Sequence, residues 1–303
     1  METSEVILRQ LATMAIYCLC GFILNKTKLI SKEGCRAFSK LLIYIVLPCV
    51  IISSFVREAE PAITNALLIC TGISVLLLFI AVLVSMAFLR NDPVAAFSAS
   101  FSNAGFMGIP LITMALGNST VLYIAPFVAL LNILQWSVGQ NLLLGKRRID
   151  IKQALLNPLF LSFALGVLIY AMPFSVPKLI TDAIGALAAC NAPIAMIILG
   201  FYMAEVPLRN LVCTREAWFV SGLRLIIIPI LSILAVAWLP GISRTIKTSL
   251  LIAASAPVGI NVAIYAELLE KDYQKAVTLI CNSSVLCVLT MPLIILLADK
   301  VIS

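Results

Sequence analysis

The sequence predicts an all-α polytopic membrane protein, with ten transmembrane helices arranged as two inverted five-helix repeats. Its composition is the first observation: 62% of the 303 residues are hydrophobic and only 12% are charged, whereas soluble proteins carry about 25% charged residues. The second is a succession of apolar segments near the length of about 20 residues that spans a bilayer as a helix. The third is a pair of glycine- and proline-containing interruptions, which predicts that helices four and nine are broken and cross each other.

Ten apolar segments follow one another along the chain, and most are long enough for one helical crossing. We expect them at residues 6–24, 37–55, 63–89, 94–116, 121–144, 158–172, 179–204, 218–239, 248–269 and 276–298. The basic stretch 146–152 is the longest polar interruption and separates five segments from the next five. We therefore expect two domains: a first five-helix repeat over residues 1–150 and a second, inverted one over residues 151–303.

An odd number of helices in each half makes the two halves enter the membrane in opposite orientations. Similar residues recur in the two halves at a nearly constant distance. Pro110 and Pro257 are 147 residues apart, and Asn132 and Asn282 are 150 apart. These offsets favour a duplication of one five-helix unit.

The fourth segment contains Asn103, Gly105, Gly108 and Pro110 within eight residues. Gly weakens a helix by about 1 kcal/mol and Pro by about 3 kcal/mol relative to Ala. Proline also removes a backbone donor and clashes with the carbonyl four residues earlier. At membrane depth, such an interruption is tolerated only where the freed backbone is buried in protein or lines a water-filled cavity.

The ninth segment carries a second interruption, over residues 256–261, which contains Pro257, Gly259 and Asn261. The N-terminal end of a half-helix carries about half a positive charge and free N–H groups, so it suits an anion. The carboxamides of Asn103 and Asn261 can donate to a carboxylate. We predict an anion-binding site between the two interruptions; plain helix kinks are the alternative.

Other polar residues within the apolar segments have two readings each. Asn191 lines the same site or stabilises a local kink near Pro193. The polar groups of the fifth and tenth segments, Gln135 and Asn282 among them, are expected to join helices by hydrogen bonds. Arg224 lies inside the eighth segment and is either a functional intramembrane charge or, as we expect, a side chain that extends to the cytoplasmic interface.

The charged and metal-ligating residues exclude several classes of protein. The chain has no histidine, its nine cysteines lack metal-ligand spacing, and all fourteen acidic residues lie in loops or near segment ends. We therefore expect no metal site, no cofactor and no enzymatic activity, since an intramembrane enzyme needs a cluster of such ligands or carboxylates. Apart from Arg224, the basic residues lie in loops or near segment ends, which indicates membrane topology and no nucleic-acid partner.

The distribution of Lys and Arg predicts the orientation of the chain in the membrane. Fourteen of the 21 basic residues lie in or beside the loops that follow the odd-numbered segments, and six lie on the opposite side, termini included. Basic loops stay in the cytoplasm, so both termini are expected on the non-cytoplasmic side of the cell membrane. The acidic N-terminus is unlike a signal peptide.

The interruptions resemble the crossover segments of the auxin efflux carrier family of membrane transporters. The similar residues are Asn103 and Met107–Pro110 in the fourth segment, and Ala256–Pro257 and Gly259–Ile260 in the ninth. Leu47–Pro48 and Pro292 fit as well, so the resemblance covers nearly the whole chain. It implies a scaffold domain and a transport domain, and substrate binding by the crossover prolines and the nearby asparagine.

The central loop is short, unlike that of the plant carriers, so the chain is more similar to the bacterial branch of the family. The resemblance then implies a secondary transporter of small organic anions such as malate or malonate, which works by alternating access. A sodium-coupled symporter of the bile-acid type is the alternative. The expected partners are the organic anion and the lipid bilayer, and a homodimer stays open. The expected substrate-binding residues are Asn103, Gly105, Gly108, Pro110, Asn191, Pro257, Gly259 and Asn261.

Overall fold

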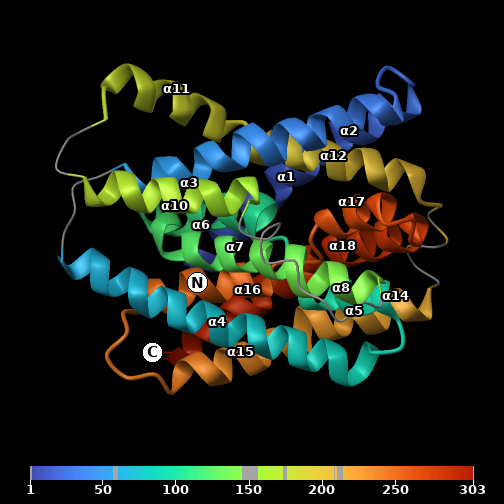
Figure 1. Ribbon diagram of the computed structural model, residues 1–303. Coiled ribbons are helices and arrows are strands. Elements are labelled where there is room, and N and C mark those ends of the chain that lie inside the picture. The colour runs from blue at the N-terminus through green and yellow to red at the C-terminus, as the bar shows by residue number, and fades with distance from the viewer. Residues whose placement is uncertain are drawn as a thin grey trace.

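The computed structural model describes residues 2–56, 61–144, 156–172, 176–207, 209 and 214–302. Apart from short connections, this part of the chain is helical, and Ser102 and Val258 form an isolated antiparallel bridge. Most helices run along one common direction, and the N and C marks lie toward the same end of the bundle (Figure 1). The predicted all-α class is confirmed.

The helices of the first half agree with the predicted segments, but several segments are divided. The second segment consists of two α-helices joined by a π-helical turn, the fourth is broken, and the fifth also contains a π-helical turn. The helices are α1 (Glu2–Lys26), α2 (Lys32–Leu41), α3 (Leu47–Phe55), α4 (Pro61–Leu89), α5 (Pro93–Ser100), α6 (Ile109–Leu116), α7 (Val121–Leu134) and α8 (Gln140–Leu144).

The second half shows the same kind of division. Its seventh predicted segment is two helices that meet at Cys190, its eighth contains a π-helical turn, and its ninth is broken. The helices are α10 (Pro158–Ala171), α11 (Lys178–Ala189), α12 (Asn191–Glu205), α14 (Arg215–Gly222), α15 (Ile228–Ala237), α16 (Arg244–Ser255), α17 (Asn261–Leu268) and α18 (Tyr273–Ile302).

Within the described ranges, six helical stretches are long and apolar enough to cross a membrane, judged by length and composition. Two shorter apolar helices, Ala104–Leu116 and Pro158–Ala171, accompany them. Large apolar side chains lie on the outside of the bundle; Leu179, for example, is 82% exposed. An apolar exterior of this kind is typical of a surface that faces lipid, and it agrees with a membrane protein.

Three of the π-helical turns have a common cause in the sequence. They occupy Leu42–Val46, Ala104–Gly108 and Leu223–Ile227, and each is followed two residues later by a proline: Pro48, Pro110 and Pro229. Proline has no N–H for the helical hydrogen bond and collides with the carbonyl four residues earlier. Widening the preceding turn moves that carbonyl away and lets the helix continue.

The helices pack as two groups. The first group contains α1, α2, α3, α10, α11 and α12, with α1 lying along α12 and both α10 and α11 against α3. The second group contains α4 to α8 and α14 to α18, in which α16 and α17 both pack on α18. Contacts between the groups are made mainly by α1 with α6 and α18, by α7 with α3 and α10, and by α12 with α18 and the turn Ala104–Gly108.

Candidate functional site at the helix breaks

The two broken helices meet through their backbones. The Asn103 N–H donates to the Pro257 carbonyl at 2.8 Å, and the Gly259 N–H donates to the Phe101 carbonyl at 3.0 Å. Ser102 and Val258 lie opposite each other between these bonds. Each break therefore satisfies backbone groups of the other, as buried backbone requires.

The first break lies before the place that the glycines and proline indicate. It occupies Phe101–Asn103, and the chain is helical again from Ala104 through the π-helical turn into α6. Pro110 is therefore inside the second half-helix, whereas Pro257 is in the break itself. The offset of 147 residues between the two prolines thus does not join equivalent positions.

Gly259 and Gly108 lie where the crossing is closest. A Cβ atom on Gly259 would be 3.1 Å from the Ser102 carbonyl oxygen, and one on Gly108 would be 3.5 Å from Ala253 Cα. Gly259 has little room for a side chain against the other break, and Gly108 packs directly on α16. A Cβ atom on Gly105 would make only ordinary contacts, with Leu47 and Val128.

Asn103, Gly105 and Asn191 come together on one side of the crossing. Asn103 is 2% exposed, and its carbonyl accepts the N–H groups of Met107 and Gly108 at the start of the second half-helix. The Asn191 Nδ2 donates to the Gly105 carbonyl at 3.0 Å. Asn103 Nδ2 and Asn191 Oδ1 are buried, and no hydrogen-bond partner for either occurs among the described residues. Such groups ordinarily have a partner, so both are available to a bound polar molecule.

Asn261 lies in a different environment. Its Nδ2 donates to Gln135 Oε1 at 2.9 Å, where α7 passes into α8. The rings of Phe97 and Trp136 pack on Tyr265 beside it, with centroids 5.3 and 5.4 Å away. The hydrogen bonds therefore link Asn191 to the turn Ala104–Gly108 and Asn261 to the turn between α7 and α8.

Polar residues of the tenth segment support the crossing, which agrees with the predicted role in joining helices. Ser283 Oγ accepts the Val258 N–H at 3.1 Å, and Ser221 Oγ donates to Asn282 Oδ1 at 2.6 Å. In the fifth segment, Asn132 Nδ2 bonds within its own helix, to the Val128 carbonyl at 2.7 Å. Ser221, Asn282 and Ser283 thus hold α14, α18 and the second break together.

The expectation for Arg224 is wrong. Its side chain does not extend to an interface: the residue is 1% exposed. The guanidinium donates to the Ala256 carbonyl at 3.0 Å and the Ala99 carbonyl at 3.2 Å. It also contacts the carbonyls of Ser100 and Ala254. Arg224 therefore lies at the ends of both α5 and α16, immediately before the two breaks.

A cavity of about 510 Å³ opens between the two helix groups and is bordered by Pro110 and Asn191. It lies toward the end of the bundle that carries the chain termini, beside the C-terminal turns of α3 and α6. Its lining combines apolar groups with polar side chains, namely Gln10, Ser53, Ser54, Thr113, Asn118 and Asn191. Among the predicted residues, this cavity thus includes two, and a third, Gly105, bonds to Asn191.

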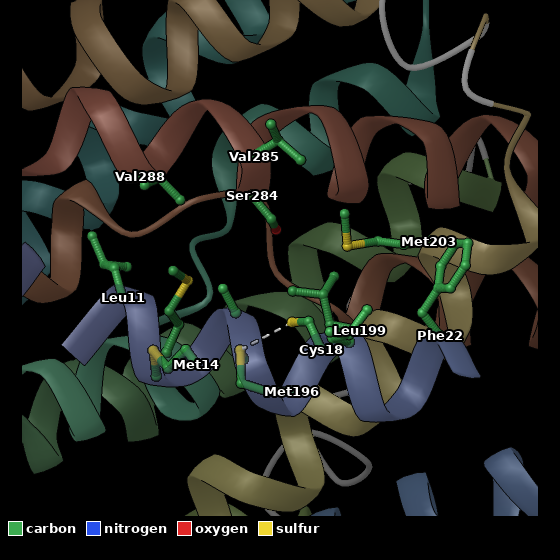
Figure 2. A pocket seen from close by; sticks show the side chains of 13 residues that line it. Leu11, Met14, Cys18, Phe22, Met196, Leu199, Met203, Ser284, Val285 and Val288 are labelled. Carbon is green, nitrogen blue, oxygen red and sulfur yellow. Dashed lines mark hydrogen bonds between the residues drawn. The ribbon is translucent and has the colours of Figure 1, made fainter. Parts of the chain in front are cut away.

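A second cavity, of about 290 Å³, is almost entirely apolar. Figure 2 shows the side chains of α1, α12 and α18 that surround it, with the sulfur atoms of Met14, Cys18, Met196 and Met203 and one hydroxyl group, that of Ser284. Met107, from the turn after the first break, also borders it. This lining suits apolar groups and offers little to bind a charged molecule.

Polar contacts join the helix groups at the opposite end of the bundle. Arg36 of α2 forms an ion pair with Glu267 of α17. Tyr273 of α18 donates to Glu205 of α12 at 2.8 Å, and the ammonium of Lys32 lies 4.1 Å from the centre of the Tyr273 ring. These contacts hold the two groups together at the end away from the larger cavity.

A further ion cluster lies within the second group. Lys275 of α18 forms ion pairs with Asp92, which caps α5, and with Glu216 of α14. Burial acts to raise the pKa of Asp92, but the hydrogen bonds from Glu216 and Lys275 outweigh it and hold that pKa below its usual range. Asp92 is thus kept charged, and α5 is fixed to α14 and α18.

Comparison with known proteins gives two results. The model of the protein family described as "Membrane transport protein" matches residues 6–149 and 147–295. A protein of Rhizobium meliloti (strain 1021) named "Putative malonate transporter" is 23% identical over 274 residues, which cover 85% of each chain. The family match extends over both breaks and over the residues that line the larger cavity.

Proposed function

Because the chain belongs to the auxin efflux carrier family of membrane transport proteins, we propose that it is a secondary transporter of small organic anions. The observation that carries the proposal is the crossing of the two broken helices at Phe101–Asn103 and residues 256–260, with a polar cavity next to it. Breaks of this kind, in paired positions, are typical of transporter binding sites.

In this proposal, the substrate carboxylate binds near the N-terminus of the second half-helix of the fourth segment. The first N–H groups of a helix have no partner within the helix, and the helix dipole favours a negative charge there. The amide of Asn103 donates to the carboxylate, and Asn191 borders the site through its bond to Gly105. The crossing is shaped by Gly108, Pro110, Pro257 and Gly259. Asn261 orients α17.

The substrate class rests on the relative and on the site. The relative's name refers to malonate, and a short dicarboxylate such as malonate or malate suits a cavity of about 510 Å³ with amide and hydroxyl donors. A sodium-coupled symporter is the second candidate function. It is favoured by the carbonyls of Ala99, Ser100, Ala254 and Ala256, which converge at the two breaks, since such carbonyls bind cations in some transporters.

The two helix groups provide the two bodies that alternating access requires. We place the chain in the cell membrane as ten helices in two inverted repeats, residues 1–150 and 151–303, with both termini outside. The larger cavity then faces the outside, while the contacts of Arg36 and Tyr273 close the cytoplasmic end. Movement of the second group against the first would break these contacts and open the site inward.

Uptake by the purified protein in liposomes tests the function. Labelled malonate and malate are expected to enter, and each is expected to compete with the other, whereas an uncharged amide of the same size is not. The same uptake with sodium or choline outside separates the two candidates, since only the symporter requires sodium. Failure of every short mono- and dicarboxylate to enter or to compete would contradict the proposal.

Cross-linking the two groups at the closed end should stop transport. In a background without native cysteines, Arg36→Cys and Glu267→Cys are joined by a short bifunctional maleimide. We expect uptake to cease, because the groups can no longer separate at that end. The matched control is Asp92→Cys with Glu216→Cys, which joins two positions inside the second group and should leave uptake unchanged. Equal uptake by both cross-linked proteins would show that this end does not open.

Pro110→Ala should reduce transport at least about tenfold, a loss near 1.4 kcal/mol. Alanine restores the N–H that Pro110 lacks, so the turn Ala104–Gly108 can become α-helical and rotate Gly105 away from Asn191. The control is Pro292→Ala in α18, nine residues beyond the Ser283 that contacts the second break. Uptake by the Pro110 variant at the wild-type rate would show that this π-helical turn does not position the site.

A further inference from the structure

Arg224 is a full positive charge in the middle of the protein with carbonyl groups as its hydrogen-bond partners. All three guanidinium nitrogens are used: Nε donates to Ala256, one terminal nitrogen to Ala99 and Ser100, and the other to Ala254. No ion pair between Arg224 and a carboxylate occurs among the described residues. A buried charge is ordinarily paired with an opposite charge or coordinated to a metal. Here the carbonyl groups must balance the positive charge of the guanidinium.

The ends of two helices supply that balance. Ala99 and Ser100 are the last residues of α5, and Ala254 and Ala256 flank the last residue of α16. The C-terminal end of a helix is equivalent to about half a negative charge, so two such ends equal about one negative charge. One guanidinium therefore neutralises both half-helices that precede the breaks.

Unwound carbonyls and the C-terminal ends of half-helices are the groups that bind a coupling sodium ion in transporters with broken helices. Here they already bind the side chain of Arg224. The π-helical turn Leu223–Ile227, caused by Pro229, contains this arginine, and its neighbours Leu223 and Leu225 are also buried.

We propose that Arg224 is a built-in cation that takes the place of a coupling ion at the crossing. The carbonyls of Ala99, Ser100, Ala254 and Ala256 form a monovalent-cation site, and the guanidinium occupies it permanently. The consequence is that the carrier binds its anion without sodium or potassium at this place. The inference rests on the proposed transport function only for this consequence, because the cation site itself can be tested without any substrate.

The test measures melting temperatures of the purified full-length chain in sodium, potassium or choline chloride at equal concentration. Three proteins are compared: wild type, Arg224→Gln, which removes the charge, and Arg224→Lys, which keeps it. Wild type and Arg224→Lys should melt at temperatures that do not depend on the cation. Arg224→Gln should melt at least about 5 °C lower in choline, and sodium or potassium should raise its melting temperature in a saturable way, because a ligand that binds the folded state stabilises it.

Each outcome of the melting-temperature test either supports or overturns the proposed cation site. Saturable stabilisation of wild type by sodium would overturn the proposal, since the site would then not be filled by Arg224. An Arg224→Gln protein that folds but responds equally to all three salts would overturn it too, because its carbonyls would bind no cation. If Arg224→Gln yields no folded protein, Arg224→Lys decides: a folded, salt-independent lysine variant supports a requirement for positive charge, and an unfolded one contradicts it.

A failure of this test and a failure of the transport proposal can be told apart. Melting temperatures require no carboxylate, so they stand even if no short organic acid enters the liposomes. Conversely, sodium-independent uptake by wild type would support transport whatever the glutamine variant does. A cation-specific response of Arg224→Gln that wild type lacks assigns the site to the guanidinium.

Discussion

Gly200→Ala and Gly21→Ala should each lower the melting temperature of the protein more than any other single methyl addition. Gly21 of α1 faces the backbone of Ile197, and Gly200 of α12 faces the backbone of Cys18, so α1 and α12 approach each other through both glycines. A Cβ atom at either position would overlap a backbone carbonyl of the other helix. Small residues are what allow helix backbones to approach closely within a membrane.

The size of this loss of stability depends on which atoms must move to make room for the added methyl group. The colliding atom is backbone, which cannot turn aside as a flexible side chain can, so α1 and α12 must separate along their length. Overpacking in a well-packed interior typically costs about 1–3 kcal/mol, and here it also disturbs the apolar cavity bordered by Met14 and Met196. We expect each variant to lie at or above the upper end of that range.

Gly72→Ala in α4 is the matched control. A Cβ atom on Gly72 would have no neighbouring heavy atom within 4 Å, and alanine favours a helix over glycine by about 1 kcal/mol. The control should therefore melt at the wild-type temperature or slightly above it. Melting temperatures of the three variants in one detergent give the comparison. If Gly200→Ala and Gly72→Ala melt alike, α1 and α12 are not packed through these glycines.

The sequence predicted the helices because the length of an apolar segment can be read from neighbouring residues alone. The sixth expected segment, 158–172, corresponds to Pro158–Ala171, and the tenth, 276–298, lies within Tyr273–Ile302. Proline and glycine also placed both interruptions in the right segments. Their exact positions depend on tertiary contacts, however. Residues Phe101–Asn103 contain neither glycine nor proline, and they leave the helix because they pair with Pro257 and Gly259 far along the chain.

For the same reason, the local sequence pattern could not predict the contacts of the Arg224 side chain. Its carbonyl partners are 30 to 125 residues away in sequence. The position of Arg224 within an apolar segment is compatible with a side chain that extends to the interface and also with one that is buried in the protein. The π-helical turn before Pro229, together with the two helix ends, decides between them. The same spacing of a π-helical turn and a proline recurs at Pro48 and Pro110, but the turns themselves are known only from the structure.

Asn103→Asp should nearly abolish substrate binding near neutral pH. In the proposed site, the Asn103 amide donates to the substrate carboxylate; its Nδ2 is buried, and no hydrogen-bond partner for it occurs among the residues that the structure describes. Aspartate removes that donor and places a negative charge beside the substrate. For two charges about 4 Å apart at an effective dielectric constant near 20, the repulsion is about 4 kcal/mol, close to a thousandfold loss in affinity.

The pH dependence distinguishes charge repulsion from a loss of shape. An aspartate that is buried or close to a second carboxylate takes up a proton more readily than a free one, and the protonated form can again donate a hydrogen bond. Affinity of Asn103→Asp should therefore partly recover between about pH 7.5 and about pH 5.5. Asn103→Ser keeps a small, neutral hydrogen-bonding group, so it should weaken binding modestly and equally at both pH values.

The measurement is the binding of malonate to the three purified proteins at the two pH values, by calorimetry or by the shift in melting temperature that ligand binding produces. Malonate's own protonation changes between these pH values, and the wild-type and serine proteins correct for it because they carry no added charge. The expected pattern is a large loss for aspartate at the higher pH that shrinks at the lower one, against a small, constant loss for serine. If Asn103→Asp binds malonate as tightly as wild type at about pH 7.5, no carboxylate lies beside Asn103, and the anion must be held by other residues.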